Sequence, residues 1–173
     1  MHRIDKKYHW YAIYTITNHE KAVNDYLEKC NIESFLPLTR TLKQWSDRKK
    51  WVDTPVFQSY VFVKVSCLEY YKVLAHPSAL KYVCFESIAT PIPEKQIEAL
   101  KQVINGNLQY ETTSRKFIPG QKVTISHGPF LNYEAEIIKY NGNKKALIRI
   151  DNIGYSLILN APNIYLKDTE LVI

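Results

Sequence analysis

The last third of the chain alternates short strand-like segments with sharp turns, and this pattern restricts the fold more than any other. In residues 117–125 a Pro-Gly turn precedes a strand in which apolar and polar side chains alternate. Gly128-Pro129 is a second turn signal, and the next strand begins near Glu134. Short strands joined by tight turns are typical of a small β-barrel. We therefore expect such a barrel over residues 117–173.

The first 105 residues combine strand and helix signals. Their order predicts a mixed sheet with helices packed against it, so the expected fold class is α+β. The expected elements are a strand at 9–16, a helix that starts at a capping box of Thr17 and Glu20, a hairpin of 34–45 and 50–57 interrupted at Pro37, a strand at 60–65, a helix at 68–75, a strand at 82–85 and a helix at 93–104.

Residues 106–116 separate these two parts. The segment starts at a glycine, is mostly polar and shows neither helical nor strand periodicity. We interpret it as a linker between a first domain, 1–105, and a second domain, 117–173.

Both domains resemble the NusG family of transcription elongation factors. The matching segments are Trp10–Tyr14, Phe35–Pro37 and Phe57–Val63 in the first domain, and 117–125, 128–130 and 134–138 in the second. The resemblance implies an N-terminal NGN domain and a C-terminal SH3-like KOW barrel, neither of which is an enzyme. The chain departs from the family at Gln58-Ser59, where Pro-Gly is usual, and at Ala135, where glycine is usual.

Specialised paralogues of the family vary at Gln58-Ser59 and in the hairpin. The short basic hairpin tip, 47–50, and the many tyrosines of this chain are most similar to the UpxY paralogues, which have an RfaH-like role. That subtype implies an antiterminator that binds RNA polymerase and suppresses pausing or termination at specific operons, such as capsular polysaccharide loci. A general housekeeping factor is the alternative subtype. A different class of function, an RNA-binding or ribosome-associated KOW protein, is the second hypothesis.

Aromatic residues cluster on two expected strands. Alternation places Trp10 and Tyr14 on one side, and Tyr60 and Phe62 on another. Ordinary core packing is one interpretation of these residues. The family resemblance implies another, in which an apolar patch grips the clamp helices of the polymerase β′ subunit. The residues of that patch would be Tyr14, Phe57, Tyr60 and Phe62.

The hairpin tip is basic and lies between two tryptophans, Trp45 and Trp51. Cations beside aromatic rings suit phosphate contact and base stacking. In the family this hairpin lies near upstream DNA, so upstream or non-template DNA is an expected partner. The candidate nucleic-acid-binding residues are Arg48, Lys49, Lys50, His19 and Lys21. The alternative is a solvated turn whose tryptophans pair across the strands.

The KOW domain offers two candidate contact residues, Phe130 and Ile153. The resemblance implies that they bind a small-subunit ribosomal protein or the termination factor Rho. Ile153 folded over the barrel end is the alternative.

Composition sets further limits. The chain carries a net charge of +6, an excess that is compatible with nucleic-acid contact. Its three cysteines lack metal-ligand spacing, and its five histidines stand apart, so we expect no metal, no cofactor and no catalytic site. No apolar run approaches the ~20 residues that cross a bilayer. We expect a cytoplasmic monomer with no membrane contact.

Overall fold

The computed structural model describes residues 4, 6–45, 47–105, 110–113, 122–125, 134–140, 143–150, 155–160 and 166–168. Contacts within the chain divide it into two compact units, Met1–Glu98 and Ala99–Ile173. Each unit is described by itself.

The first unit is built on a four-stranded sheet in the order β2-β5-β1-β6. Its strands are β1 (His9–Thr15), β2 (Glu33–Phe35), β5 (Tyr60–Val65) and β6 (Ala79–Tyr82). Every ladder is antiparallel, so the expectation of a mixed sheet is wrong. Strands β1 and β2 are joined through α1, but β5 lies between them, and strands β5 and β6 are joined through α2, but β1 lies between them. Because strands joined through a helix are never neighbours here, the sheet contains no parallel pair.

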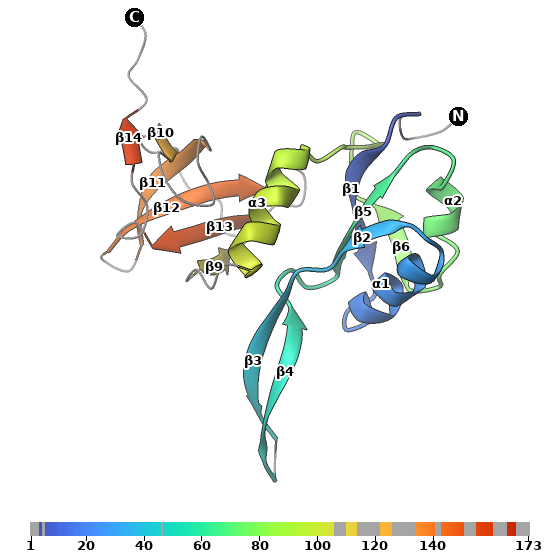
Figure 1. Ribbon diagram of the computed structural model, residues 1–173, viewed down its shortest axis with the longest axis horizontal. Helices are drawn as coiled ribbons and strands as arrows, with labels where there is room; N and C mark the ends of the chain where they lie inside the picture. Colours follow the sequence, from blue (N-terminus) through green and yellow to red (C-terminus); the bar gives the residue numbers. More distant parts are fainter. Residues whose placement is uncertain are drawn as a thin grey trace, which may run out of the picture. The chain divides into compact units, whose positions relative to one another are not determined.

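Helices α1 (Glu20–Lys29) and α2 (Tyr70–Val73) lie on the same side of this sheet (Figure 1). Their apolar side chains pack with alternate residues of the strands, because successive strand residues point to opposite faces. The core of this layer consists of Ile4, Tyr11, Ile13, Val23, Leu27, Ile32, Val61, Val63, Val65, Val73, Ala79, Tyr82 and Ala89. Helix α2 is shorter than the expected 68–75.

The start of α1 differs from the expected capping box. His19 is the N-cap residue and makes no side-chain capping bond. The Thr17 hydroxyl instead bonds the Ser59 hydroxyl at 2.8 Å, and Glu20 accepts a hydrogen bond from the Ser59 N–H. Both side chains that were expected to cap the helix therefore hold the turn before β5.

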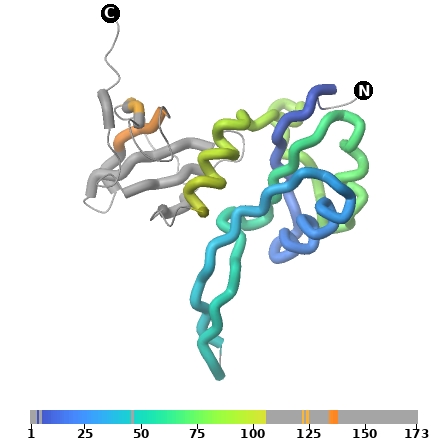
Figure 2. Tube along the Cα trace, in the orientation of Figure 1, coloured from blue at the N-terminus to red at the C-terminus, as the bar shows by residue number. Residues whose placement is uncertain are grey.

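Strands β3 (Leu38–Gln44) and β4 (Lys49–Pro55) form a separate two-stranded sheet. Seven residues per strand give a ribbon of roughly 23 Å. The ribbon extends away from the four-stranded sheet (Figures 1 and 2). Pro37 lies between β2 and β3, because it cannot donate a hydrogen bond to a sheet ladder. Beyond β6, a second small hairpin pairs β7 (Cys84–Phe85) with β8 (Ile88–Ala89).

Helix α3 (Glu94–Asn105) follows Pro93, as the sequence predicts. The boundary between the two units falls within this helix. Its first turn is tied to β5, since the Lys64 ammonium lies 2.6 Å from the Glu94 carboxylate. The Glu94 carboxylate raises the pKa of Lys64 above its ordinary value, burial opposes that rise, and Glu33 and Glu98 add to it. In the described residues no helix is long and apolar enough to span a membrane.

The second unit contains a six-stranded antiparallel sheet in the order β14-β10-β11-β12-β13-β9. The strands are β9 (Tyr110–Thr113), β10 (Lys122–Ile125), β11 (Glu134–Tyr140), β12 (Asn143–Ile150), β13 (Tyr155–Asn160) and β14 (Leu166–Asp168).

Strand β9 lies inside the expected linker of 106–116 and pairs with β13. Hydrogen bonds to β13 therefore bring β9 into the sheet, although the sequence of β9 does not alternate apolar and polar residues. Ala135, where the family usually has glycine, lies buried in β11 opposite Val123. Strand backbone has negative φ, so this position does not need glycine.

Candidate functional site: an aromatic surface and a basic hairpin

The register of β1 against β5 brings the aromatic residues of both strands to one face of the sheet. Tyr14 lies opposite Tyr60, Ala12 opposite Phe62 and Trp10 opposite Lys64. Residues directly opposite each other in an antiparallel pair share a face. Trp10, Tyr14, Tyr60 and Phe62 therefore all lie on the side that α1 and α2 leave uncovered, and their expected separation onto two sides is wrong.

Tyr14 and Tyr60 form the accessible part of this face. Their ring centroids are 5.4 Å apart and the rings meet edge to face, the arrangement that the ring quadrupoles favour. Tyr14 is exposed and Tyr60 is half-buried. Both rings are therefore at least partly accessible to solvent. We call this pair the tyrosine surface.

Buried phenylalanine rings lie near the tyrosine surface. Phe62 stacks on Phe35 with ring centroids 6.1 Å apart, and it meets Phe57 edge to face at 6.0 Å. Phe57 and Phe62 have no exposed surface. Of the four residues predicted to form an apolar binding patch, Tyr14 and Tyr60 are therefore accessible to solvent, and the two phenylalanines are buried.

The other predicted residues of the β1–α1 segment are exposed. The Nδ1 atom of His19 lies 2.8 Å from the Ser78 hydroxyl oxygen, which ties the segment to the turn before β6. Lys21 lies one residue into α1. Both residues lie where β1 leads into α1, on elements other than the β3–β4 ribbon.

The two faces of the β3–β4 ribbon differ in chemistry. On one face Trp51 lies opposite Leu42, and the Arg40 guanidinium lies 5.7 Å from the centre of the Trp51 ring. On the other face Lys43 lies directly opposite Lys50. Like charges in direct opposition destabilise a ladder. Their presence there favours an anionic partner.

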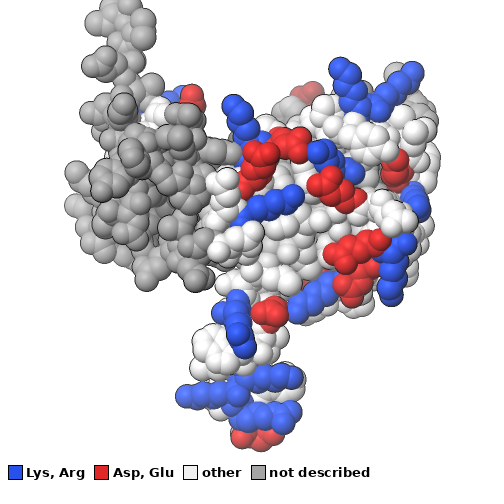
Figure 3. Space-filling model, viewed as in Figure 1, with Lys and Arg blue, Asp and Glu red and all other residues white. Residues whose placement is uncertain are grey.

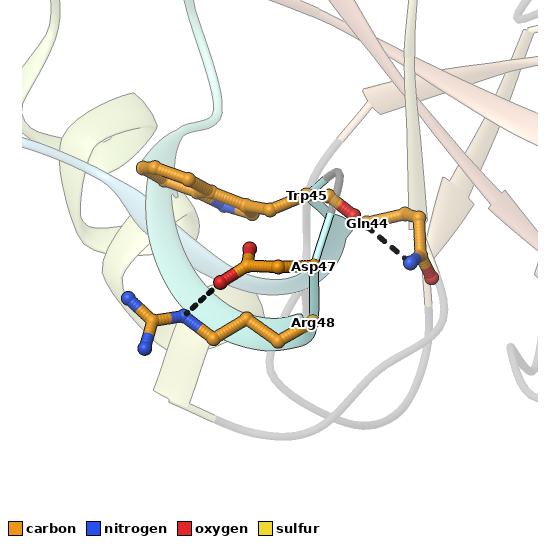
Figure 4. Close-up of polar contacts among 4 residues, drawn as sticks. All are labelled: Gln44, Trp45, Asp47 and Arg48. Carbon is orange, nitrogen blue, oxygen red and sulfur yellow. Dashed lines mark hydrogen bonds and ion pairs between the residues drawn. The ribbon is translucent and has the colours of Figure 1, made fainter.

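Figure 3 shows the positive charge gathered on this ribbon, with one acidic residue at its far end. The tip is closed by a hydrogen bond from the Trp45 N–H to the Arg48 carbonyl. The side chains of Trp45, Asp47 and Arg48 extend to one side of the tip and that of Gln44 to the other (Figure 4). The Arg48 Nε lies 3.9 Å from the Asp47 carboxylate, and both groups are well exposed.

Several site predictions have a clear outcome in this geometry. Arg48 lies at the tip, and Lys49 and Lys50 lie on β4 with exposed side chains. The predicted pairing of Trp45 with Trp51 is wrong, because Leu42 is the partner of Trp51. Phe130 and Ile153 lie outside the described residues. In the described part of the chain no group of three or more His, Cys, Asp or Glu side chains is placed to hold a metal.

Sequence reasoning missed Glu20, Phe35 and Lys43 as parts of these surfaces. Counting the expected hairpin backward from its tip pairs Lys43 with Val52, whereas the observed register pairs Lys43 with Lys50 because β3 ends at Gln44 and β4 begins at Lys49. The contact of Phe35 with Phe62 joins β2 to β5 across the sheet, and no local pattern specifies it.

Comparison with known proteins identifies the family. A model of the NusG family, described as transcription termination factor nusG, matches residues 8–101. The chain belongs to the NusG family. It is therefore a transcription termination/antitermination factor, and this family consists of transcription factors, not enzymes.

Individual NusG proteins are distant relatives. The NusG of Helicobacter pylori strain 26695, a transcription termination/antitermination protein, is 24% identical over 150 residues, which cover 80% of this chain and 85% of the relative. The Campylobacter jejuni NusG is 24% identical over 143 residues, 76% of this chain and 80% of that protein. The structure of Thermotoga maritima NusG has a similar fold, with a TM-score of 0.53 at 18% identity over 95% of this chain and 98% of that one.

Proposed function

We propose that this NusG-family factor binds RNA polymerase through the tyrosine surface and suppresses pausing or termination. The observation that carries the proposal is the Tyr14–Tyr60 pair, two partly accessible aromatic rings in contact on a sheet face. Tyrosines often dominate protein interfaces, since they supply large contact areas and lose little conformational entropy. The expected partner is the coiled coil of the β′ clamp helices.

The buried phenylalanines support this proposal. A binding surface that is ordered before it meets its partner loses less conformational entropy on association. Phe62 lies on the same sheet face as the two tyrosines, is fully buried and packs against Phe57 and Phe35. A packed region beside the tyrosine pair supports a surface that is ordered before docking against a rigid coiled coil.

A second contact of the same factor would be made by the β3–β4 ribbon. Arg48 at the tip and the Lys43–Lys50 pair on one face of the ribbon provide cations for a polyanion. Lys49 adds a cation on the opposite face, where Trp51 is available for stacking on an unpaired base. Upstream or non-template DNA is the proposed ligand. His19 and Lys21 would extend the contact at a separate place on the first unit.

The C-terminal part would act as a KOW barrel of residues 117–173. Five antiparallel strands of one sheet, β10 to β14, lie within these residues and support that assignment. Phe130 and Ile153 are the proposed contacts for a small-subunit ribosomal protein or Rho. The departure from Pro-Gly at Gln58-Ser59 and the basic hairpin support an UpxY-type antiterminator that serves specific operons.

The test is binding of the full chain to the isolated β′ clamp-helix coiled coil. We expect Tyr14→Ala and Tyr60→Ala each to weaken binding by about 30-fold, the loss typical of an interface residue worth ~2 kcal/mol. Phe85→Ala is the matched control, because Phe85 is an exposed aromatic residue of the same unit on β7. Unchanged binding of the double variant Tyr14→Ala/Tyr60→Ala would falsify the proposal.

The rival function is an RNA-binding or ribosome-associated KOW protein. The basic ribbon is the observation that favours it. Capture of partners from nuclease-treated host extract separates the two. Recovery of polymerase subunits that depends on Tyr14 and Tyr60 supports the elongation factor, whereas recovery of ribosomal proteins or RNA alone supports the rival.

A further inference from the structure

A buried carboxylate lies beside the tyrosine surface. Glu20 is 2% exposed, and among residues whose side chains are described it is the only acidic residue that is fully buried. Burying a carboxylate is costly unless it is hydrogen-bonded or lies in a favourable field. Glu20 has both compensations, because it accepts a hydrogen bond and is the first residue of α1, where the helix dipole favours negative charge.

The donor to Glu20 is the backbone N–H of Ser59, at 2.7 Å. Ser59 has a φ of 66°, in the left-handed region that costs a residue with a Cβ atom about 1–2 kcal/mol. It is the last residue before β5, so its backbone sets the direction in which Tyr60 enters the sheet. A disfavoured conformation persists only where the surroundings determine it.

Two further hydrogen bonds hold the same turn. The Ser59 carbonyl accepts a hydrogen bond from the Thr15 N–H at 2.8 Å, and its hydroxyl bonds that of Thr17. Thr15 directly follows Tyr14 on β1. The turn is therefore fixed to the segment that carries one tyrosine and leads into the strand that carries the other.

We propose that Glu20 is a positioning residue that holds Ser59 in the left-handed conformation and thereby keeps Tyr60 edge to face against Tyr14. This inference rests on the proposed function, in which the tyrosine surface binds polymerase. Glu20 itself is buried and does not contact the partner. Its removal leaves a buried Ser59 N–H without an acceptor and allows the turn to relax toward negative φ.

The experiment compares Glu20→Ala, Glu20→Gln and Ser59→Gly in the full chain. Two quantities are measured, the proton–proton contact between the Tyr14 and Tyr60 rings by NMR without any partner, and affinity for the clamp-helix coiled coil. We expect Glu20→Ala to lose the ring contact and to bind about tenfold more weakly. Glu20→Gln keeps a carbonyl acceptor and should stay within about threefold of the unmodified chain.

Glycine at position 59 supplies the matched rescue. Glycine adopts positive φ without steric cost, so Ser59→Gly/Glu20→Ala should bind within about threefold of Ser59→Gly alone. Ser59→Ala is the control, since it keeps the Cβ atom and removes only the hydroxyl bond to Thr17. If Glu20 only stabilised the fold, Glu20→Ala would lower the affinity equally in the chain with Ser59 and in the chain with Ser59→Gly, and that result overturns the proposal.

Two further outcomes remain decisive. If Glu20→Ala does not fold, Glu20→Asp replaces it, because the shorter side chain no longer reaches the Ser59 N–H. A ring contact between Tyr14 and Tyr60 that persists in Glu20→Asp overturns the proposal. If the double tyrosine variant binds normally, the proposed function fails. The partner-free ring contact still tests the role of Glu20 in that case, so the two failures are distinguishable.

Discussion

The tyrosine surface and the β3–β4 ribbon both present aromatic rings to solvent, yet they are built in opposite ways. Tyr14 is 37% exposed on a four-stranded sheet, on the same face as the fully buried Phe62, whereas Trp51 is 55% exposed on a two-stranded ribbon. The exposed neighbours of Trp51 include lysine and arginine. Exposed aromatic residues thus have packed apolar neighbours on the tyrosine surface and exposed cationic neighbours on the β3–β4 ribbon.

The contrast indicates which partners suit each region. Rings fixed by close packing favour a partner of defined shape, because complementarity at an interface requires both surfaces to be ordered. A charged ribbon with separate aromatic rings tolerates a partner whose bases and phosphates vary in position. The first arrangement suits a protein helix, and the second suits nucleic acid.

The largest test of this contrast removes a buried ring from the sheet face that carries the tyrosine surface. Phe62→Ala should lower the free energy of unfolding by about 3–5 kcal/mol, the usual effect of truncating a fully buried phenylalanine. Urea unfolding of the full chain measures it. Phe85→Ala, which truncates a 69% exposed ring, should change stability by about 0.5 kcal/mol or less. A loss below ~1 kcal/mol in Phe62→Ala would show that the supporting layer is not tightly packed.

The local elements that carry these residues were largely predictable. Strand β5 has the expected bounds of 60–65, and α3 begins one residue from the expected 93. Continuous β-branched and aromatic residues specify the strand, and a proline in the first turn specifies the helix start. These signals act within a few residues, which is why the sequence alone contains them.

What the sequence does not contain is long-range pairing. The insertion of β5 between β1 and β2 decides that Phe35, Phe62 and Tyr14 share a face, and it depends on contacts between segments far apart in the chain. The same holds for Glu20, which matches a local capping motif but bonds Ser59, 39 residues away. Here a tertiary contact replaced the local one that propensity favoured.

A second test addresses the ribbon. Trp51→Ala should weaken binding of a single-stranded oligodeoxynucleotide by about 30-fold, since stacking of one base on an aromatic side chain is worth ~1–3 kcal/mol. Fluorescence anisotropy at fixed salt measures the affinity. Leu42→Ala is the matched control, because Leu42 lies opposite Trp51 on the same face and is apolar but not aromatic. Equal losses in both variants would mean that apolar area matters and stacking does not.

A third test measures how completely the helix-covered face of the sheet excludes water. Tyr82 is buried there, stacked on Tyr70 with ring centroids 4.6 Å apart. Burial raises the pKa of Tyr82 well above its ordinary range, and the neighbouring Tyr70 and Tyr11 add to the rise. Because the folded pKa is raised, this contribution to stability is complete below about pH 10 and declines as pH rises further.

Tyr82→Phe removes the ionisable group and keeps the ring. Between pH 8 and pH 11 the unmodified chain should lose about 1.4 kcal/mol of its free energy of unfolding through Tyr82, because one proton is lost only on unfolding. The variant lacks this loss, so its stability relative to the unmodified chain should rise by that amount. Urea unfolding at both pH values gives the difference. Tyr71→Phe alters an exposed tyrosine and should show a much smaller gain. Equal gains would mean that water reaches the Tyr82 hydroxyl.

The smallest expected effect concerns the like-charged pair of the ribbon. Lys43→Gln removes the repulsion with Lys50 and should stabilise the β3–β4 ladder by about 0.2–1 kcal/mol, seen as slower amide hydrogen exchange in both strands. The same variant should bind single-stranded DNA more weakly, with a salt dependence reduced by about 0.7 in the slope of log affinity against log salt. Lys29→Gln, in the last turn of α1, controls for loss of one exposed charge away from the ribbon. Opposite signs for ladder stability and nucleic-acid affinity would indicate that the Lys43–Lys50 pair serves binding at the expense of the ladder, whereas a loss of both would assign the pair a structural role.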